Sequence, residues 1–160
     1  MGQNKEDRSP GTISVNRKAY HDYHILETVE AGLVLTGTEV KSLRMGRVSI
    51  REAYVRPEGG ELWLVGAHIP RYLAGGPYNH DPARDRKLLL HRKEIDRLIG
   101  MASPKGRTLV PLRVFFHRGW AKLEVGVGQG KKQYDKRQVL KEREAAREID
   151  RALKTRHGER

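Results

Sequence analysis

The sequence contains no cysteine, and this absence removes two classes of structure at once. No disulfide can form, and no zinc site built on thiolates is available. A reducing cytoplasm is therefore the simplest setting that we expect for this chain. No apolar run reaches the roughly 20 residues that a helix needs to cross a bilayer. The opening MGQNKEDRSPGTISV also lacks the apolar segment of a secretory signal, so we expect neither secretion nor membrane insertion.

Acidic residues are scarce relative to basic ones. The 160 residues include 20 Asp and Glu against 32 Lys and Arg, and the formal net charge is +12. Such a chain attracts polyanions by Coulomb attraction and by release of condensed counterions. Nucleic acid is the partner class that we favour. An anionic membrane surface is the second interpretation, which would require a basic helix with a strong apolar face. The third is that the charge only keeps the chain soluble.

Most segments between residues 13 and 129 alternate apolar and polar side chains, as half-buried strands do. Turn signals divide them into three hairpins: YHILETV-EAG-LVLTG, IREAYVR-PEGG-ELWLVGAHIP and TLVPLRVFFHRGWAKLEVGV. Short antiparallel strands favour a closed barrel, because closure removes exposed edges. We predict a mainly β fold, a small six-stranded antiparallel barrel similar to the oligonucleotide-binding (OB) fold. A sandwich is the alternative.

In the third hairpin, alternation assigns one set of side chains to a single face of each strand. The sets are Val110, Leu112, Val114 and Phe116 in the first strand, and Ala121, Leu123, Val125 and Val127 in the second.

Two or three short helices are expected beside these strands. In GTEVKSLRMG, Thr36 and Glu39 have the spacing of a capping box, and Gly46 is placed to end the helix. Val40 and Leu43 would then face the core. HRKEIDRLIGMA places its apolar residues at helical spacing and predicts a second helix.

Composition divides the chain into a flexible arm (1–12), an RNA-binding barrel (13–129) and a basic tail (130–160). Residues 131–160 hold eleven Lys or Arg and six Asp or Glu, with few large apolar side chains. The tail has strong helix formers, but an isolated helix held by charges alone is marginal in water. We expect it to be disordered when free and helical when docked on a partner.

Two short motifs raise the question of catalysis. HDYH at 21–24 and NHDP at 79–82 contain residues that metal sites and hydrolases use. Their spacing alone is weak evidence for a metal, and the Asp-Pro pair is also typical of a helix start. The chain has no nucleophile elbow, phosphate-binding loop or dinucleotide fingerprint. We expect no enzymatic activity, cofactor or metal. A nuclease using the His and Asp of both motifs is the alternative.

Aromatic residues interleave with cations in two stretches. Their rings could stack on unpaired bases while the cations meet phosphates, and structured RNA exposes such bases whereas duplex DNA hides them. For any single Tyr, covering the barrel rim is an equally good explanation. The first stretch holds Arg17, Lys18, Tyr20, His21 and Tyr23, and the second holds Arg71, Tyr72, Tyr78, His80, Arg84, Arg86 and Lys87.

The segment NRKAYHDYHILETVEAGLVLTGTEVKSLRMGRVSI, at 16–50, closely resembles the SmpB family, the SsrA-binding proteins of bacteria. The resemblance continues through DPARDRKLLLHRKEI and GKKQYDKRQVLKERE and covers nearly the whole chain after about residue 12. EAG, GTEVKSLR, RKLLL and GKKxxDKR in this order are not generic features of barrels.

The resemblance implies a non-enzymatic factor with an OB-like barrel. It implies binding to the tRNA-like domain of transfer-messenger RNA (tmRNA, SsrA) and delivery of that RNA to stalled ribosomes for trans-translation. Protein and RNA together would imitate a tRNA, with one protein per tmRNA standing where the anticodon arm would be. The tail would enter the empty message channel of the small subunit. A generic OB-like RNA chaperone or ribosome-associated RNA-binding protein is the alternative.

The same resemblance links individual positions to these roles. Asn16, Glu30 and Leu89 match positions linked to tmRNA binding. The alternatives without the resemblance are that Leu89 is a core residue and that Glu30 belongs to a turn. The tail positions linked to action on the ribosome are Gly130, Lys131, Lys132, Asp135, Lys136 and Arg137. Many members have His before DKR, where this chain has Tyr134. Stacking on a ribosomal base survives that difference, whereas a titrating role does not.

Overall fold

A computed structural model describes residues 11–131, 144, 146–149 and 151–152. Seven strands and four helical segments follow one another along the described chain. In order they are β1 (Thr12–Val15), α1 (Arg17–Asp22), β2 (Tyr23–Leu33), α2 (Gly37–Arg44), β3 (Tyr54–Glu58), β4 (Glu61–Val65), the 3-10 turn η2 (Leu73–Gly75), β5 (Arg86–Leu89), α3 (Arg92–Ala102), β6 (Arg107–His117) and β7 (Trp120–Gly130).

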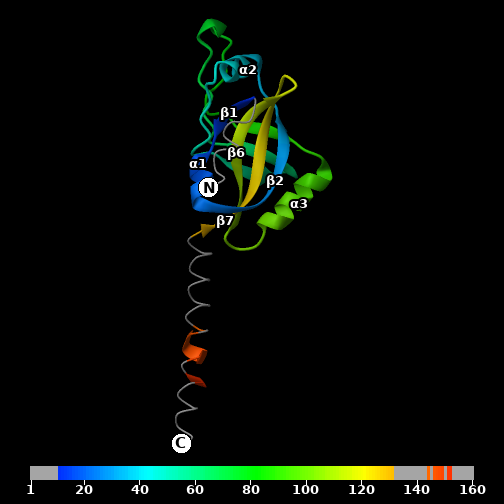
Figure 1. The fold of residues 1–160 in the computed structure, drawn as a ribbon. Coiled ribbons are helices and arrows are strands. Elements are labelled where there is room, and N and C mark those ends of the chain that lie inside the picture. Colours follow the sequence, from blue (N-terminus) through cyan, green and yellow to red (C-terminus); the bar gives the residue numbers. More distant parts are fainter. Residues whose placement is uncertain (1–10, 132–143, 145, 150, 153–160) are drawn as a thin grey trace, which may run out of the picture.

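All the strands join one antiparallel sheet in the order β1-β6-β7-β2-β5-β4-β3. The sheet curls strongly, and β3 comes back into contact with β6. Its two end strands, β1 and β3, are not paired with each other, so the barrel-like sheet stays open (Figure 1). The mainly β, antiparallel prediction is confirmed, whereas full closure is not observed.

The predicted count of six strands is wrong for a specific reason. EAG does not form a turn: Glu30, Ala31 and Gly32 pair in register with Glu124, Leu123 and Lys122 inside the long strand β2. Pairing with β7 therefore overrides the local turn signal. Two short strands, β1 and β5, were missed, because four residues are too few to show alternation. The other two hairpins are confirmed as β3–β4 and β6–β7.

Two β-bulges divide the buried side chains between the two faces of the sheet. The main core lies on the concave inner face, and a second cluster of Ala19, Val110 and Leu112 lies on the outer face beneath α1. The register shifts between Pro111 and Arg113 in β6, and between Ile25 and Glu27 in β2. Each bulge adds one residue and reverses the alternation beyond it. The predicted single face for Val110 to Phe116 is therefore wrong. In β7, the prediction is confirmed, because Leu123, Val125 and Val127 are in the main core and Ala121 packs against it.

The two predicted helices are present. Helix α2 begins with the predicted capping box, in which the Glu39 backbone N–H donates to Thr36 Oγ1 (3.4 Å) and the Thr36 N–H donates to Glu39 Oε1 (2.9 Å). It ends before Gly46, whose φ of +73° suits glycine. Leu43 is buried and Val40 half-buried.

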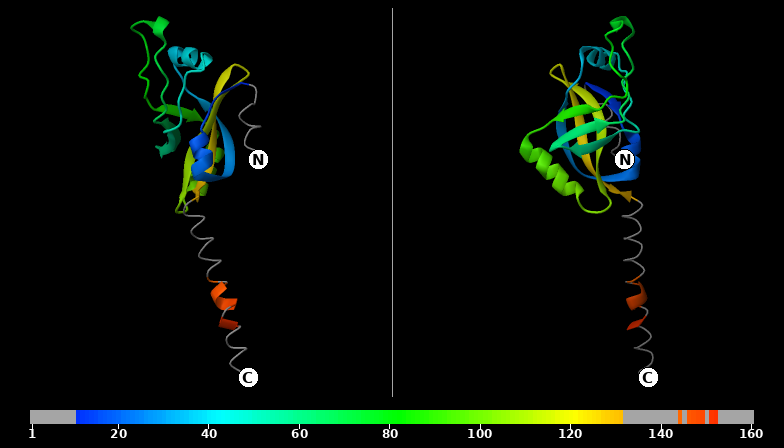
Figure 2. Two further views of the ribbon diagram at one scale, coloured as in Figure 1. Left: turned by 60° about the vertical axis from the view of Figure 1, so that its left-hand side comes forward. Right: turned by 180° about the vertical axis from the view of Figure 1, so that it is seen from behind.

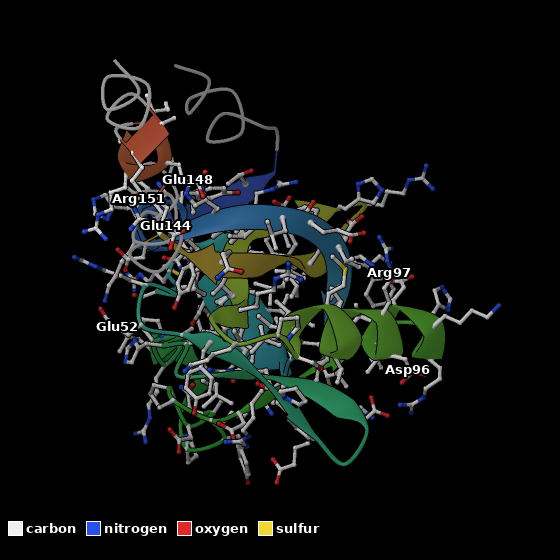
Figure 3. All side chains as sticks on the ribbon, turned by 90° about the horizontal axis from the view of Figure 1, so that it is seen from below. Glu52, Asp96, Arg97, Glu144, Glu148 and Arg151 are labelled. Carbon is white, nitrogen blue, oxygen red and sulfur yellow. The ribbon has the colours of Figure 1, made fainter. Side chains whose placement is uncertain are left out.

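Helix α3 covers one side of the sheet, against β6 and β7, with Ile95 and Leu98 in the core (Figure 2). Arg97 on its exposed side forms an ion pair with Glu27 of β2 (Figure 3). Helix α1 was not predicted from the sequence.

No helix in the described part of the chain is long and apolar enough to cross a membrane. The described tail residues 144, 146–149 and 151–152 have helical backbone. Within them, Glu148 and Arg151 are spaced to attract one another, while Glu144 and Glu148 repel (Figure 3). The prediction for the rest of the tail lies outside the described residues.

Gly126 in β7 is close-packed in the second cluster. A Cβ at this position would lie 2.7 Å from Leu112 Cδ1 and 3.3 Å from Ile25 Cγ2. Because Leu112 is fully buried, Gly126→Ala should lower the free energy of unfolding by about 1–3 kcal/mol, as overpacking does. Gly37→Ala, where nothing lies within 4 Å, is the matched control. Urea denaturation of both variants checks this, and equal midpoints would contradict it.

Candidate nucleic-acid interface

Asn16 fixes α1 to the sheet. Its Oδ1 accepts from the Ala19 N–H (3.2 Å), which caps the helix. Its Nδ2 donates to the backbone carbonyls of Ile50 (3.2 Å) and Pro111 (2.9 Å). Only 3% of Asn16 is exposed. The side chain therefore holds α1 in place, and little of Asn16 is exposed for a direct contact with RNA.

Helix α1 presents two cations and an imidazole ring to solvent. Arg17, Lys18 and His21 are exposed, and together with Val15 and Arg51 they line a hollow on the surface. Lys18 also pairs with Glu52 (3.2 Å). Arg51, on the loop before β3, was missed, because no local pattern links it to α1.

Tyr20 and Tyr23 lie partly buried on the second cluster. The Tyr20 hydroxyl donates to Glu124 Oε1 over 3.5 Å. A Cβ added to Gly128 would lie 2.9 Å from the Tyr23 ring, so the ring lies flush on the backbone of β7. Both rings keep exposed parts and connect α1 with the outer face of the sheet.

The outer face carries Glu30 of β2 and Leu89 of β5. Gly32 is paired directly with Leu89 on one side and with Lys122 on the other. Alternation places Glu30, two residues before Gly32, on this same face. Leu89 is 53% exposed, so the alternative that it is a core residue is excluded. Lys87, two residues before Leu89, shares the face. Lys122 was missed by sequence analysis.

The opposite side of β5 holds a buried ion cluster around Glu39. Glu39 Oε2 accepts from Arg86 Nε (2.7 Å), and Oε1 accepts from Arg84 Nε (3.0 Å). Arg86 also donates to the carbonyls of Ala67 (2.7 Å) and Pro82 (3.0 Å), and it is fully buried. This burial leaves no part of the Arg86 side chain exposed for a direct contact with RNA. Glu39, its structural partner, was assigned only a capping role from the sequence.

Two opposing effects set the pKa of Glu39. Desolvation by burial raises it, but hydrogen bonds from Arg84, the Thr36 backbone and Arg86, together with the Arg86 charge, outweigh that effect. The pKa of Glu39 is therefore lowered from its ordinary value, and the carboxylate stays ionised as the joint partner of two arginines.

The loop between β4 and β5 is fastened at its base and exposed at its tip. His80 Nε2 donates to the Ile69 carbonyl (2.8 Å), while Nδ1 accepts from Thr38 Oγ1 (2.8 Å). Asn79 closes the tip through two bonds with the Tyr72 backbone. Tyr78 beyond them is 90% exposed. The loop is thus an ordered protrusion (Figure 2).

The nuclease alternative does not fit this geometry. His80 is buried with both ring nitrogens engaged. Asp81 does not start a helix, since its Oδ1 accepts from the Ala83 N–H in a turn. Its partners in the hypothesis, His21 and Asp22, lie on α1. Among the described residues, no group of three His, Cys, Asp or Glu could hold a metal ion.

The tail begins beside α1. Gly130 pairs with Tyr23 at the end of the β2–β7 ladder, and its N–H donates to the Gly106 carbonyl (3.0 Å). Lys131 follows with helical backbone. The other predicted tail positions, Lys132, Tyr134, Asp135, Lys136 and Arg137, lie outside the described residues.

Comparison with known proteins gives one consistent result. The family model described as "SmpB protein" matches residues 13–155. The SsrA-binding protein of Carboxydothermus hydrogenoformans is 56% identical over 145 residues, covering 91% of this chain and 97% of the relative. That of Salinispora tropica is 60% identical over 140 residues, with 88% of each chain covered.

A solved structure described as "tmRNA-SmpB: a journey to the center of the bacterial ribosome" contains a similar chain. It superposes with a TM-score of 0.63 at 52% identity, covering 74% of this chain and 83% of that chain. Sequence motifs, fold and relatives agree: this chain belongs to the SmpB family.

Proposed function

We propose that this protein binds the tRNA-like domain of tmRNA and delivers that RNA to stalled ribosomes for trans-translation. It acts by binding and positioning, without a catalytic step, in the cytoplasm, one protein per tmRNA. The protein stands where an anticodon arm would be, and its tail probes the empty message channel near the decoding region.

One observation carries the proposal at the level of residues. Glu30 and Leu89, which two separate family motifs link to tmRNA binding, lie on one exposed face of neighbouring strands. A shared exposed surface is what a common ligand requires. Lys87 on the same face, and the Arg17 and Lys18 side chains of α1, supply cations for phosphates, and the exposed His21 ring lies beside them.

The remaining predicted residues have indirect roles in this proposal. Asn16 and Arg86 are buried and act by holding α1 and β5 in position. Tyr20 and Tyr23 offer partly exposed rings for stacking. Residues 130–160, with Gly130, Lys131, Lys132, Tyr134, Asp135, Lys136 and Arg137 at their start, act on the ribosome.

The alternative is a generic OB-like RNA chaperone. It would bind many RNAs with similar affinity, and removing the tail would weaken all of them alike. The two functions differ in whether RNA preference belongs to the barrel.

A titration of residues 1–130 against the full chain tests the proposal. The RNAs are tmRNA, an ordinary tRNA and a random RNA of equal length, each at several salt concentrations, because phosphate contacts set the salt dependence. Both core clusters end before residue 130, so the shortened chain keeps them.

We expect the shortened chain to keep its preference for tmRNA while peptide tagging on stalled ribosomes is lost. The barrel then selects the RNA and the tail acts in the channel. Loss of preference on shortening, or no preference in the full chain, would favour the chaperone.

A further inference from the structure

We infer that the Glu30 carboxylate binds the Watson–Crick edge of an unpaired guanine, which lies on a platform formed by Gly32, Leu89 and Lys122. This inference rests on the proposed function, in which the outer face of the sheet contacts tmRNA. It adds the chemical identity of the base.

Glu30 is an electrostatic anomaly in the fold. It lies directly opposite Glu124 across the β2–β7 ladder, and like charges in that relation repel. Glu124 is compensated by Arg113 Nε at 2.9 Å. Glu30 is exposed and has no ion pair within the described part of the chain. In a protein of net charge +12, this carboxylate contributes nothing evident to the fold, which points to an external donor.

The surroundings of Glu30 offer an exposed apolar side chain on which a flat ligand can stack. Strand β2 lies between β5 and β7. At Gly32 it has no side chain, and this position lies between Leu89 of β5 and Lys122 of β7. Two strand spacings separate these flanking backbones, about 10 Å. A Cβ at Gly32 would lie 3.2 Å from Leu89 Cβ and 3.6 Å from Leu89 Cδ1, so the Leu89 side chain lies over Gly32. A base can stack on the exposed Leu89 side chain, with Lys122 placed for a backbone phosphate.

The charge of Glu30 limits what it can bind in RNA. An ionised carboxylate only accepts hydrogen bonds, so it repels phosphates and requires N–H or O–H donors. Guanine N1–H and N2–H₂ are adjacent donors on one edge and match the two carboxylate oxygens. Adenine and cytosine offer one amino group there, and uracil offers one N–H. Only guanine forms a two-point, charge-assisted pair, and unpaired bases in RNA expose this edge.

The test combines Glu30→Gln in the full chain with inosine substitution in the RNA. Inosine lacks the N2 amino group and is placed, one position at a time, at each unpaired guanine of the tRNA-like domain. Glu61→Gln on β4 is the control carboxylate. Thermal unfolding of each variant is measured alongside, and Glu30→Gln should not unfold earlier than wild type, since the change removes a repulsion.

We expect Glu30→Gln to weaken tmRNA binding about 10- to 100-fold, as loss of a two-point base contact does, with Glu61→Gln unchanged. At one guanine, inosine should weaken binding by wild type and have no further effect on Glu30→Gln. If every inosine weakens binding by both proteins equally, the guanine assignment is wrong. It is also wrong if a 2′-deoxy nucleotide at one of these positions, in place of inosine, weakens binding by wild type but not by Glu30→Gln.

Two further results separate the inference from the function beneath it. If Glu30→Gln binds tmRNA normally but abolishes tagging, Glu30 contacts the ribosome or a protein, and the inference is overturned while the function stands. If wild type does not prefer tmRNA over a random RNA, the proposed function itself has failed.

Discussion

Glu39→Gln should lower the free energy of unfolding by about 3–5 kcal/mol, the range for removing one partner of a buried ion pair. The carboxylate is fully buried and is the ionic partner of both Arg84 and Arg86. Without its charge, the Arg86 guanidinium remains enclosed at 0% exposure with only carbonyl acceptors. Chemical denaturation at neutral pH measures the loss. Glu52→Gln removes an exposed partner of Lys18 instead and should cost at most about 1 kcal/mol.

The same variant should alter the response of the protein to acid. The pKa of Glu39 is lowered in the folded state, so its stabilising contribution is present above the unfolded value near 4.5 and is lost as pH falls through the folded pKa. Wild type should therefore lose stability below about pH 4.5 more steeply than Glu39→Gln. Parallel loss in both proteins from pH 5 to 3 would show that the carboxylate is not stabilised by its arginines.

Asn16→Ala should lower the free energy of unfolding by at least about 2 kcal/mol, because each buried polar group left without a partner costs about 1–3 kcal/mol. The change removes the cap of α1 and the Asn16 donor of the Pro111 carbonyl, while the Ile50 carbonyl keeps the Ala53 N–H as a donor. It should also weaken RNA binding, since α1 would no longer hold Arg17 and His21 in place.

Asn16→Ser separates the two effects. Serine can keep the cap at Ala19 but is too short to reach both carbonyls. Asn16→Ser should recover part of the free energy of unfolding that Asn16→Ala loses. It should recover a larger share of the RNA affinity that Asn16→Ala loses. Denaturation and RNA titration of both variants check this. An Asn16→Ala protein of wild-type stability with lost RNA binding would mean that Asn16 contacts RNA itself.

Local signals in the sequence were sufficient where structure is local. The capping box at Thr36 and Glu39 predicted α2 correctly, because cap and helix lie within one turn. The β6–β7 hairpin was predicted because its two strands are adjacent in the chain. EAG failed because its partner is β7, far along the sequence, and turn propensity gives no information about that pairing.

The candidate site shows the same limit. Family motifs named Glu30 and Leu89, but only the register of β2 with β5 and β7 brings Gly32 and Lys122 between and beside them. Arg86 sits in a basic, exposed-looking motif, RKLLL, and alternation alone does not tell which side of a short strand is buried. The position of Glu39 beneath it decides that.

The two bulges also constrain how the gene can change. Strands β2 and β6 flank β7, and each carries one additional residue relative to it. Deleting a single residue at either bulge would restore regular alternation and turn the side chains beyond it to the opposite face. Either the residues of the main core or those beneath α1 would then meet solvent. These strands can therefore vary in residue type but not in length, and insertions and deletions should be confined to the connections between strands.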